Sequence, residues 1–344
     1  MALLDVSNLD VRFALRQGEV KALRDVSFTL DRGERLGIVG ESGAGKSVAA
    51  FTLLNLIAKP GYIAGGSIRF DGQELTTMKP RQLQQIRGNK ISMIFQDPMM
   101  TLNPVLTIGE QMVECLKAHR RIRTRAAREI ALNKLRQVPI PSPEKRLDQY
   151  PHELSGGMRQ RIIIAIALLL DPDIIVADEP TTALDVTIQA EIMSLLLELC
   201  EKHNVALVLI THDLGVVSQV TQRTLVMYAG RVIEQGPTRE IINDAQHPYT
   251  QGLINALPQM ATPGSRLNQI PGAMPTLSRI PSGCAFHPRC SFAFNDDGSP
   301  RRDCREVIPG FVRSGNCDVA CHMVRDLVEN NSDARDPVEF QEAP

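Results

Sequence analysis

The stretch GESGAGKS, residues 40–47, follows the apolar run LGIV and precedes a mostly apolar run that begins VAAFTLL. This order predicts a strand, a glycine-rich turn and a helix. The three glycines let the backbone turn so that amide N–H groups point inward. The positive end of the helix that begins at Lys46 is directed to the same point. Such a loop binds phosphate, Lys46 adds a full charge near the outer phosphates, and the Ser47 hydroxyl is suited to ligate Mg²⁺. The nucleotide-binding residues that we expect here are Gly40, Ser42, Gly43, Gly45, Lys46 and Ser47.

The length and composition of the chain suit one large α/β domain with an appendage. The chain has 344 residues, and its 38 basic and 39 acidic side chains leave no net field that would attract nucleic acid. The longest strongly apolar run, residues 162–170, is much shorter than the roughly 20 residues that cross a bilayer. The N-terminus lacks the basic and apolar pattern of a secretory signal. We therefore expect a cytoplasmic chain that does not span the membrane.

The residue pattern and composition change along the chain. Strand-like segments fill the first 40 residues, recur at 65–75 and return at 173, whereas the stretch from about Met99 to Gln149 is helical and rich in Gln, Arg and Ala. Proline and glycine increase after about Glu240, and the last residues are polar and acidic. We expect an α/β core at 1–96 and 151–243, an inserted helical subdomain at 97–150, an irregular cysteine-bearing C-terminal extension at 244–325 and a disordered tail at 326–344.

Two carboxylates follow a buried strand in DIIVADEP, residues 173–180. A helical pattern at 186–203 separates this strand from VALVLITHD at 205–213, which is the order of a parallel sheet with a crossover helix. Adjacent side chains at a strand end point in different directions, which permits two roles. We predict that Asp178 holds Mg²⁺, directly or through water, and that Glu179 orients and deprotonates the attacking water.

A second phosphate-binding helix start is predicted in LSGGMRQR, residues 154–161, where Ser155, Gly156 and Gly157 precede the apolar helix. LSGGMRQR resembles the signature motif of ATP-binding cassette (ABC) ATPases, and GESGAGKS and ADEP resemble their two nucleotide motifs. The resemblance covers roughly residues 4 to 240. It implies a P-loop NTPase core of RecA-like fold, with ATP and Mg²⁺ as ligands and ATP hydrolysis as the reaction.

The same resemblance assigns roles to single residues. Gln96 in MIFQDP is similar to the glutamine that senses the γ-phosphate and Mg²⁺, and His212 in ITHD to the switch histidine that contacts the γ-phosphate. Asp185 in TALD resembles the aspartate of the D-loop. Phe13 matches an aromatic position that stacks on adenine, although a core strand residue is an equally good interpretation of this phenylalanine.

The resemblance also implies partners. In this family the signature loop of one protomer closes over the phosphate loop of another, so we expect a second ABC ATPase subunit, identical or homologous. The further partners implied are two transmembrane permease subunits and, indirectly, an extracytoplasmic solute-binding protein, with the chain peripheral on the cytoplasmic face of the membrane. The HRRIRTRAAR stretch at 119–128 is either a solvated helix face or a docking surface for such a partner.

The C-terminal segment narrows the resemblance. HPYTQGL, IPGAMPTL and GCAFHPRC are similar to the tail of ATPase subunits from dipeptide and oligopeptide importers, and SMIFQDPMMTLNP agrees with that branch. This implies uptake of peptides, with other small solutes open because related importers share the tail. The alternative from another functional class is a soluble ABC ATPase that acts on nucleic acid or ribosomes.

Five of the seven cysteines lie between residues 284 and 321, whereas Cys115 and Cys200 fall in helical patterns and are expected to be buried thiols. Clustered cysteines in a reducing compartment favour a metal over disulfides. Relatives with this tail have four comparable cysteines associated with a [4Fe–4S] cluster. An iron–sulfur cluster, zinc, an empty site and disulfides all remain open, as does regulation of the ATPase by this segment. The expected ligands are Cys284, Cys290, Cys304 and Cys321, with Cys317 as an alternative fourth ligand and His287 and His322 as possible substitutes.

Overall fold

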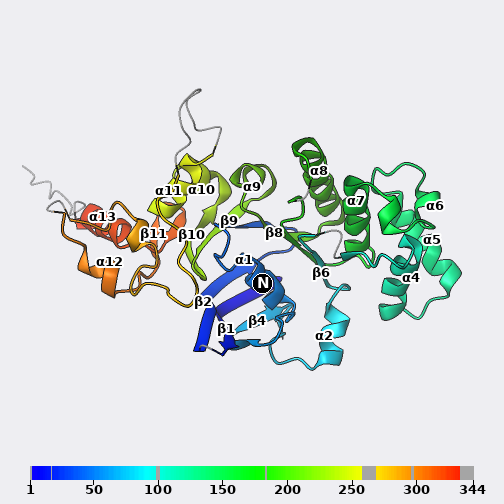
Figure 1. The fold of residues 1–344 in the computed structure, drawn as a ribbon, viewed down its shortest axis with the longest axis horizontal. Coiled ribbons are helices and arrows are strands. Elements are labelled where there is room, and N and C mark those ends of the chain that lie inside the picture. Colours follow the sequence, from blue (N-terminus) through cyan, green and yellow to red (C-terminus); the bar gives the residue numbers. More distant parts are fainter. Residues whose placement is uncertain are drawn as a thin grey trace, which may run out of the picture.

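The computed structural model describes residues 2–16, 18–97, 101–182, 184–257, 269–295 and 298–333. In this part of the chain a small sheet and a large sheet pack together, and helices surround the large one (Figure 1). The helices between residues 108 and 146 lie at one end of the molecule, and the C-terminal extension lies at the other. The phosphate loop lies between these two ends.

The small sheet is antiparallel. Its strand order is β2 (Gly18–Leu30), β1 (Leu4–Leu15), β4 (Gly61–Phe70) and β5 (Gln73–Glu74). Burial nearly alternates along the first half of β1, so one face of the sheet packs on the core and the other meets solvent.

The large sheet combines a parallel and an antiparallel part. Strands β9, β3, β8, β7 and β6 are parallel, and β10, β12 and β11 continue the sheet in antiparallel fashion. In spatial order the strands are β11 (Val312–Ser314), β12 (Cys317–Val319), β10 (Arg231–Pro237), β9 (Arg223–Tyr228), β3 (Arg35–Val39), β8 (Ala206–Ile210), β7 (Ile174–Asp178) and β6 (Ile91–Ile94).

The central strands β7 and β8 are buried along their whole length, as parallel strands covered on both faces must be. Their side chains alternate between two apolar clusters. Ile175 and Leu207 belong to the cluster shared with the helical segment, whereas Ile174 and Val208 belong to the cluster between the two sheets. This is why the runs IIVA and ALVLI are continuously apolar.

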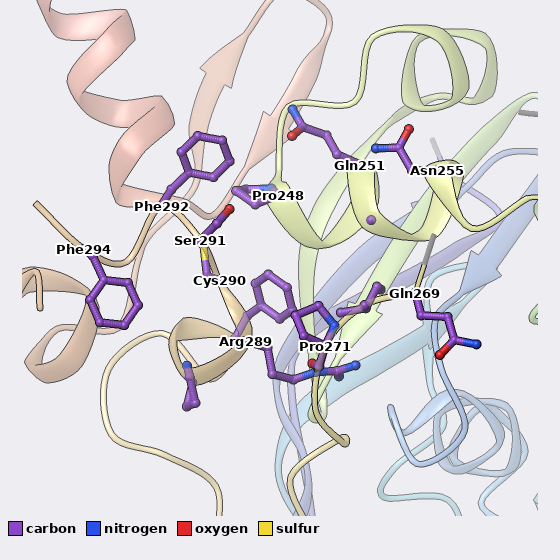
Figure 2. A pocket seen from close by; sticks show the side chains of 14 residues that line it. Pro248, Gln251, Asn255, Gln269, Pro271, Arg289, Cys290, Ser291, Phe292 and Phe294 are labelled. Atoms are coloured by element: carbon purple, nitrogen blue, oxygen red, sulfur yellow. Dashed lines mark hydrogen bonds between the residues drawn. The ribbon is translucent and has the colours of Figure 1, made fainter. Parts of the chain in front are cut away.

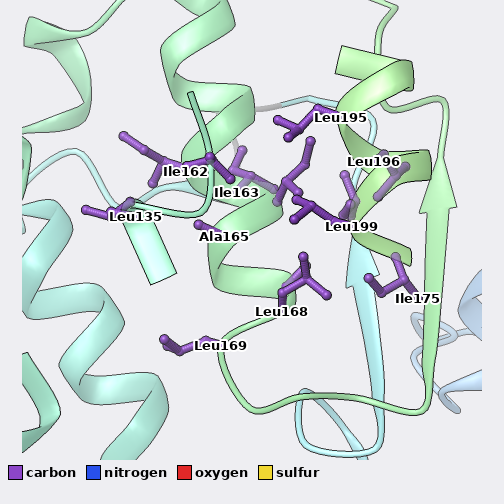
Figure 3. Packing of buried hydrophobic residues seen from close by; sticks show 14 of the residues in the cluster. Leu135, Ile162, Ile163, Ala165, Leu168, Leu169, Ile175, Leu195, Leu196 and Leu199 are labelled. Carbon is purple, nitrogen blue, oxygen red and sulfur yellow. The ribbon is translucent and has the colours of Figure 1, made fainter. Parts of the chain in front are cut away.

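The helical segment packs on one face of the parallel strands. Figure 3 shows Ile162 and Ile163 of α7 (Gly156–Ala167), and Leu168 directly after it, close to Leu195 and Leu199 of α8 (Val186–His203). Thr107 begins α4 with a capping box in which its side chain and that of Glu110 each pair with the other's backbone. The elements of this region are α4 (Ile108–His119), α5 (Thr124–Leu135), α6 (Pro143–Arg146), the 3₁₀ turn η1 (Pro151–Glu153), α7 (Gly156–Ala167) and α8 (Val186–His203).

The remaining helices surround the sheets and build the extension. Among them, α1 (Lys46–Leu53) follows the phosphate loop, α2 (Pro80–Ile86) precedes β6, and α9 (Leu214–Val220) follows β8. The extension contains α10 (Thr238–Asn243), α11 (Pro248–Asn255), the 3₁₀ turn η3 (His287–Arg289), α12 (Arg302–Glu306) and α13 (His322–Asp333). Its apolar side chains, Tyr249 and Phe286 among them, join those of β3, β9 and α9 in a third apolar cluster.

The C-terminal part differs from the sequence-based prediction in two ways. The extension is not wholly irregular, because β11 and β12 add two strands to the large sheet. The prediction of disorder from residue 326 is wrong for residues 326–333, which form the end of α13. Val324 is buried and Val328 packs against the same apolar cluster, so a spacing of four residues holds this otherwise polar helix in place. The rest of the expected tail, 334–344, lies outside the described residues.

Candidate functional site

The phosphate loop connects β3 to α1, as the sequence predicts. Gly40 has φ 154°, and a Cβ atom there would lie 2.3 Å from the carbonyl oxygen of Met227, so a side chain cannot be accommodated. Gly45 begins α1 in the left-handed region, at φ 102°, and no side chain caps the helix. Its first amide groups are therefore left for a ligand.

Lys46 is held against the loop. Its ammonium donates to the carbonyl oxygen of Gly40 at 2.8 Å and to that of Glu41 at 3.1 Å. Burial lowers the pKa of Lys46, and the carboxylates of Glu179, Asp178 and Glu41 oppose that shift. The charge is thus fixed at the loop before any phosphate arrives.

Asp178 and Ser47 meet at the end of β7. The Ser47 hydroxyl donates to Oδ1 of Asp178 at 3.1 Å, and Asp178 is only 2 % exposed. Burial raises the pKa of Asp178, partly offset by the hydrogen bond from Ser47. Two adjacent oxygen donors of this kind are the ligands that Mg²⁺ prefers.

Glu179 is the centre of a hydrogen-bonded group. Nε2 of Gln96 donates to its Oε2 at 3.0 Å, the Thr182 hydroxyl donates to the same oxygen at 2.9 Å, and Nδ1 of His212 lies 3.2 Å from Oε1. Burial alone would raise the pKa of Glu179, but the bonds from His212 and Thr182 outweigh it and the net shift is downward. The carboxylate is therefore charged near neutral pH and can accept a proton, and Nδ1 of His212 carries the hydrogen in this contact.

Most of these side chains line one cavity of about 670 Å³, although Asp178 and Thr182 are not part of its lining. The lining combines the phosphate loop, residues that follow β6, β7 and β8, and two apolar residues of the extension. It consists of Glu41, Ser42, Gly43, Gly45, Lys46, Ser47, Val48, Gln96, Glu179, His212, Met274 and Leu277. Segments that are far apart in the sequence therefore build a site for a phosphate-bearing ligand.

Other expected site residues lie outside this cavity lining. Ser155 caps α7, where its hydroxyl accepts from the amide of Met158 at 3.4 Å, and Asp185 caps α8 by accepting from the amide of Ile188 at 3.0 Å. A Cβ on Gly157 would lie 3.1 Å from Ile188, so the two helix starts are adjacent. Ser155 and Gly156 are exposed.

Phe13 is also absent from the cavity lining. It is half-buried on β1, opposite Val20 of β2 and Gly61 of β4, and it packs against the cluster between the sheets. A Cβ on Gly61 would lie 2.7 Å from the Phe13 ring, so the glycine makes room for this side chain. These contacts are those of a core residue on a strand, which was one of the two interpretations of Phe13.

Three residues that sequence reasoning missed hold the phosphate loop from outside. Arg289 forms two hydrogen bonds with the Glu41 carboxylate, at 2.7 and 3.0 Å, and the Tyr249 hydroxyl accepts from the Glu41 amide at 2.8 Å. Met274 reaches the cavity from the same extension. A periodic pattern cannot reveal contacts between residues more than 200 positions apart in the sequence. The only signal in the sequence was the resemblance of HPYTQGL, IPGAMPTL and GCAFHPRC to an importer tail.

The extension contains a second, much smaller cavity of about 20 Å³, whose lining includes four cysteines, Cys284, Cys290, Cys304 and Cys321. All seven cysteines of the chain are free thiols. Burial raises the pKa of Cys284 to about 11 and that of Cys304 to about 12. Although these thiols converge, no group of three or more His, Cys, Asp or Glu side chains among the described residues is arranged to hold a metal ion.

The other candidate ligands are placed differently. Cys317 is buried on β12, where its sulfur faces Gly236, and it does not line the cysteine cavity. His287 and His322 line the cavity, but each has a ring nitrogen 2.9 Å from a carbonyl oxygen, of Cys284 and Val307 respectively. The expected buried thiols are placed as predicted, with Cys200 buried and Cys115 partly buried.

The helices give no sign of a membrane span. Within the described ranges, none combines the length and the apolar character needed to cross a bilayer.

Comparison with known proteins agrees with this geometry. Residues 23–182 match the ABC transporter family, and residues 233–296 match the family described as oligopeptide/dipeptide transporter, C-terminal region. The chain is 44 % identical to the dipeptide transport ATP-binding protein DppD of Haemophilus influenzae, over 100 % of both chains. It is 50 % identical to the oligopeptide transport ATP-binding protein OppD of Salmonella typhimurium, over 85 % of this chain and 87 % of the relative.

Solved structures of the same fold are also similar. One is a dimeric ATP-binding cassette in a post-hydrolysis state bound to ADP and Pi, with a TM-score of 0.62 and 29 % identity, covering 69 % of this chain and 99 % of the other.

Proposed function

Since this chain belongs to the ABC transporter family, as an ATP-binding subunit of the oligopeptide and dipeptide branch, we propose that it powers the uptake of peptides through a membrane permease. The family and the solved cassettes confirm two predictions made from sequence, namely the P-loop NTPase fold and ATP hydrolysis. The observation that carries the peptide proposal is that the cassette and the extension both match this branch, over the full length of DppD.

The cavity residues and Asp178 have separate roles in hydrolysis. Lys46 and the loop amides bind the outer phosphates, while Ser47, Gln96 and Asp178 would hold Mg²⁺, which offsets phosphate charge when bound. The Glu179 carboxylate would then orient the attacking water and take its proton at Oε1 or Oε2. Gln96 and His212 contact the same carboxylate, so loss of the γ-phosphate would change their contacts.

The site is incomplete in a single subunit. Ser155, Gly156 and Gly157 begin an amide-rich helix, yet they lie outside the lining of their own cavity. We propose that they close over the nucleotide of a second ATPase subunit, beside the Asp185 cap. Two nucleotides would then be held between two subunits, and loss of the γ-phosphate would release them.

The helical segment, residues 97–150, is our proposed docking unit for the permease, next to the core at 1–96 and 151–243. Gln96 precedes it directly, so movement at the γ-phosphate has a short path to it. Arg121, Arg123 and Arg125 are exposed, whereas Arg128 is paired with Asp148 at 2.6 Å. The chain would thus lie on the cytoplasmic face of the membrane, with a solute-binding protein acting on the far side.

Purification from native membranes tests this function. We expect the full chain to co-purify with apolar permease subunits, and its ATPase rate to increase when those subunits are present. The alternative function, action on nucleic acid or ribosomes, is not favoured by the relatives or by a net charge of −1. Co-purification with RNA in place of permease subunits would contradict the proposal.

For the cysteine cavity we propose a metal–thiolate site, with an iron–sulfur cluster as its form. The support is that four thiols and His247 line one cavity, and that Nε2 of His247 is buried without a hydrogen-bond partner. Nδ1 of this histidine accepts from the Tyr249 amide, so the free Nε2 carries the hydrogen of the neutral ring. At about 20 Å³ the cavity has room for about one water, so the four cysteines would have to separate and lose their protons on binding.

Two cysteine variants separate this site from a nearby thiol. After anaerobic purification we expect iron and sulfide in the wild-type chain and in Cys317→Ser, because Cys317 does not line the cavity. We expect their loss in Cys321→Ser. A wild-type protein without iron, sulfide or zinc would contradict the proposal.

A further inference from the structure

Glu41 of the phosphate loop forms polar contacts with the C-terminal extension. Both carboxylate oxygens of Glu41 accept from the guanidinium of Arg289, and the Glu41 amide donates to the Tyr249 hydroxyl. The carbonyl oxygen of Glu41 accepts from Lys46. Every polar group of this loop residue therefore has a partner. Two of its four partners come from the extension, and the other two, Lys46 and the amide of Ala44, belong to the phosphate loop.

Arg289 is itself fixed in place. Its Nε donates to the Pro271 carbonyl oxygen at 2.7 Å, and its guanidinium carbon lies 5.9 Å from the centres of the Tyr228 and Phe286 rings. Figure 2 shows Arg289 beside Pro271, at the base of a pocket that Phe292 and Phe294 border farther away. The Arg289 side chain is 5 % exposed, so its ion pair with Glu41 is protected from solvent screening.

Tyr249 is equally constrained. Its ring is packed edge-on against Tyr228 at 4.7 Å and against Phe286 at 5.4 Å between ring centres, and it is fully buried. The hydroxyl can thus reach the Glu41 amide in one geometry only. Both contacts with the loop rest on the same aromatic cluster.

The charge of Glu41 gives these contacts a consequence for binding. Glu41 lines the cavity in which the phosphates would lie, and a free carboxylate there would repel a triphosphate. The bidentate pair with Arg289 directs this carboxylate towards the extension and neutralises it.

We propose that Arg289 and Tyr249 are positioning residues for ATP binding, which hold Glu41 in the phosphate loop and cancel its charge. The extension is then a working part of the nucleotide site, whatever solute the assembled transporter carries. Removing the Arg289 guanidinium leaves the Glu41 carboxylate uncompensated in the cavity, whereas removing that carboxylate as well makes the guanidinium unnecessary.

The test measures the Kd of the full chain for Mg²⁺–AMP-PNP, a non-hydrolysable ATP analogue. We expect Arg289→Ala to raise the Kd by about tenfold, the scale of one charge-assisted hydrogen bond at a binding site. The double variant Glu41→Gln with Arg289→Ala should recover most of the affinity. Arg302→Ala, which removes an exposed arginine paired with Glu306 in the same extension, is the matched control and should bind as the wild type does.

A purely structural role for Arg289 would give another pattern. In that case Arg289→Ala would lower the melting temperature, and adding Glu41→Gln would not restore the affinity. A double variant that binds as weakly as Arg289→Ala would therefore overturn the proposal. If Arg289→Ala does not fold, Tyr249→Phe answers the question, because it removes one oxygen and retains the packed ring. We expect it to weaken binding several-fold, and unchanged binding by this variant would also overturn the proposal.

Discussion

At the scale of the residue, the site depends on a carboxylate held in an unusual backbone conformation. Glu179 has φ 45°, which non-glycine residues rarely adopt, yet its amide still donates to the Ile210 carbonyl oxygen at 2.8 Å. Such strain persists where the surroundings fix it, often at functional sites. The sequence predicted Glu179 from ADEP and named Gln96 and His212 as site residues, but it predicted neither Thr182 nor the contacts of these three side chains with Glu179.

We predict that Glu179→Gln lowers ATP turnover by roughly 10² to 10⁴, the scale of a lost general base, while ATP still binds. The amide keeps the shape of the side chain but cannot take the proton. Steady-state ATPase rates and AMP-PNP affinity measure the two effects. Glu198→Gln, at an exposed glutamate on α8, is the control; a Glu179→Gln enzyme with normal turnover would show that another group is the base.

A second residue-scale prediction concerns Gly40. Gly40→Ala would place a methyl group 2.3 Å from the Met227 carbonyl oxygen, so the loop or β9 must shift. We expect a loss of unfolding free energy of about 1–3 kcal/mol, typical of overpacking, together with weaker nucleotide binding. Thermal and denaturant unfolding measure the first effect.

Gly18→Ala is the matched control for Gly40→Ala. Gly18 also has positive φ, at 121°, but a Cβ there would meet nothing within 4 Å. If the two variants lose the same free energy of unfolding, backbone strain alone accounts for Gly40 and the close approach to Met227 is irrelevant.

At the scale of the element, sequence predicted most of the core but little of the extension. The helix expected at 186–203 is α8, Val186–His203, because its apolar residues recur with helical spacing between an aspartate cap and Asn204. The short strands β11 and β12 could not be found in this way. β12 pairs with β10, about 80 residues earlier in the chain, and β11 pairs only with β12 among the described strands, while Val312 and Val319 alone give no period.

The start of α11 depends on a buried carboxylate of β10. Glu234 is fully buried, and its oxygens accept from the amides of Gln246 and His247 at 2.8 and 3.2 Å. Burial raises its pKa, and these hydrogen bonds only partly oppose the shift. The protein is therefore stabilised by the protonated form, and this contribution is complete below the unfolded pKa of 4.5 and is lost as the pH rises through the folded pKa.

We therefore predict that Glu234→Gln gains stability relative to the wild type as the pH rises from about 4.5 to 8. Melting temperatures of both proteins across this range give the comparison. Glu306→Gln, at an exposed carboxylate of α12, should follow the wild type at every pH. A difference between Glu234→Gln and the wild type that does not change with pH would show that Glu234 is already charged in the folded state at acid pH.

At the scale of the whole molecule, one chain joins three parts around a nucleotide cavity. The helical segment follows Gln96, the start of α7 is exposed where we propose that a second subunit binds, and the extension contacts the phosphate loop through Arg289. The first two relations could be predicted, because the motifs of the family are ordered along the sequence. The third could not, since an ion pair between residues 41 and 289 leaves no local pattern.

The central claim is that ATP hydrolysis in this cavity drives peptide uptake. The most direct test reconstitutes the chain with its permease subunits and solute-binding protein in vesicles, with ATP on the side of the ATPase, and measures entry of a labelled peptide. We predict ATP-dependent uptake with the wild-type chain and with Glu198→Gln, and almost none with Glu179→Gln, although each variant is present in the complex. Equal uptake by Glu179→Gln and the wild type, or ATP hydrolysis by the wild-type complex with no peptide entry, would contradict the account.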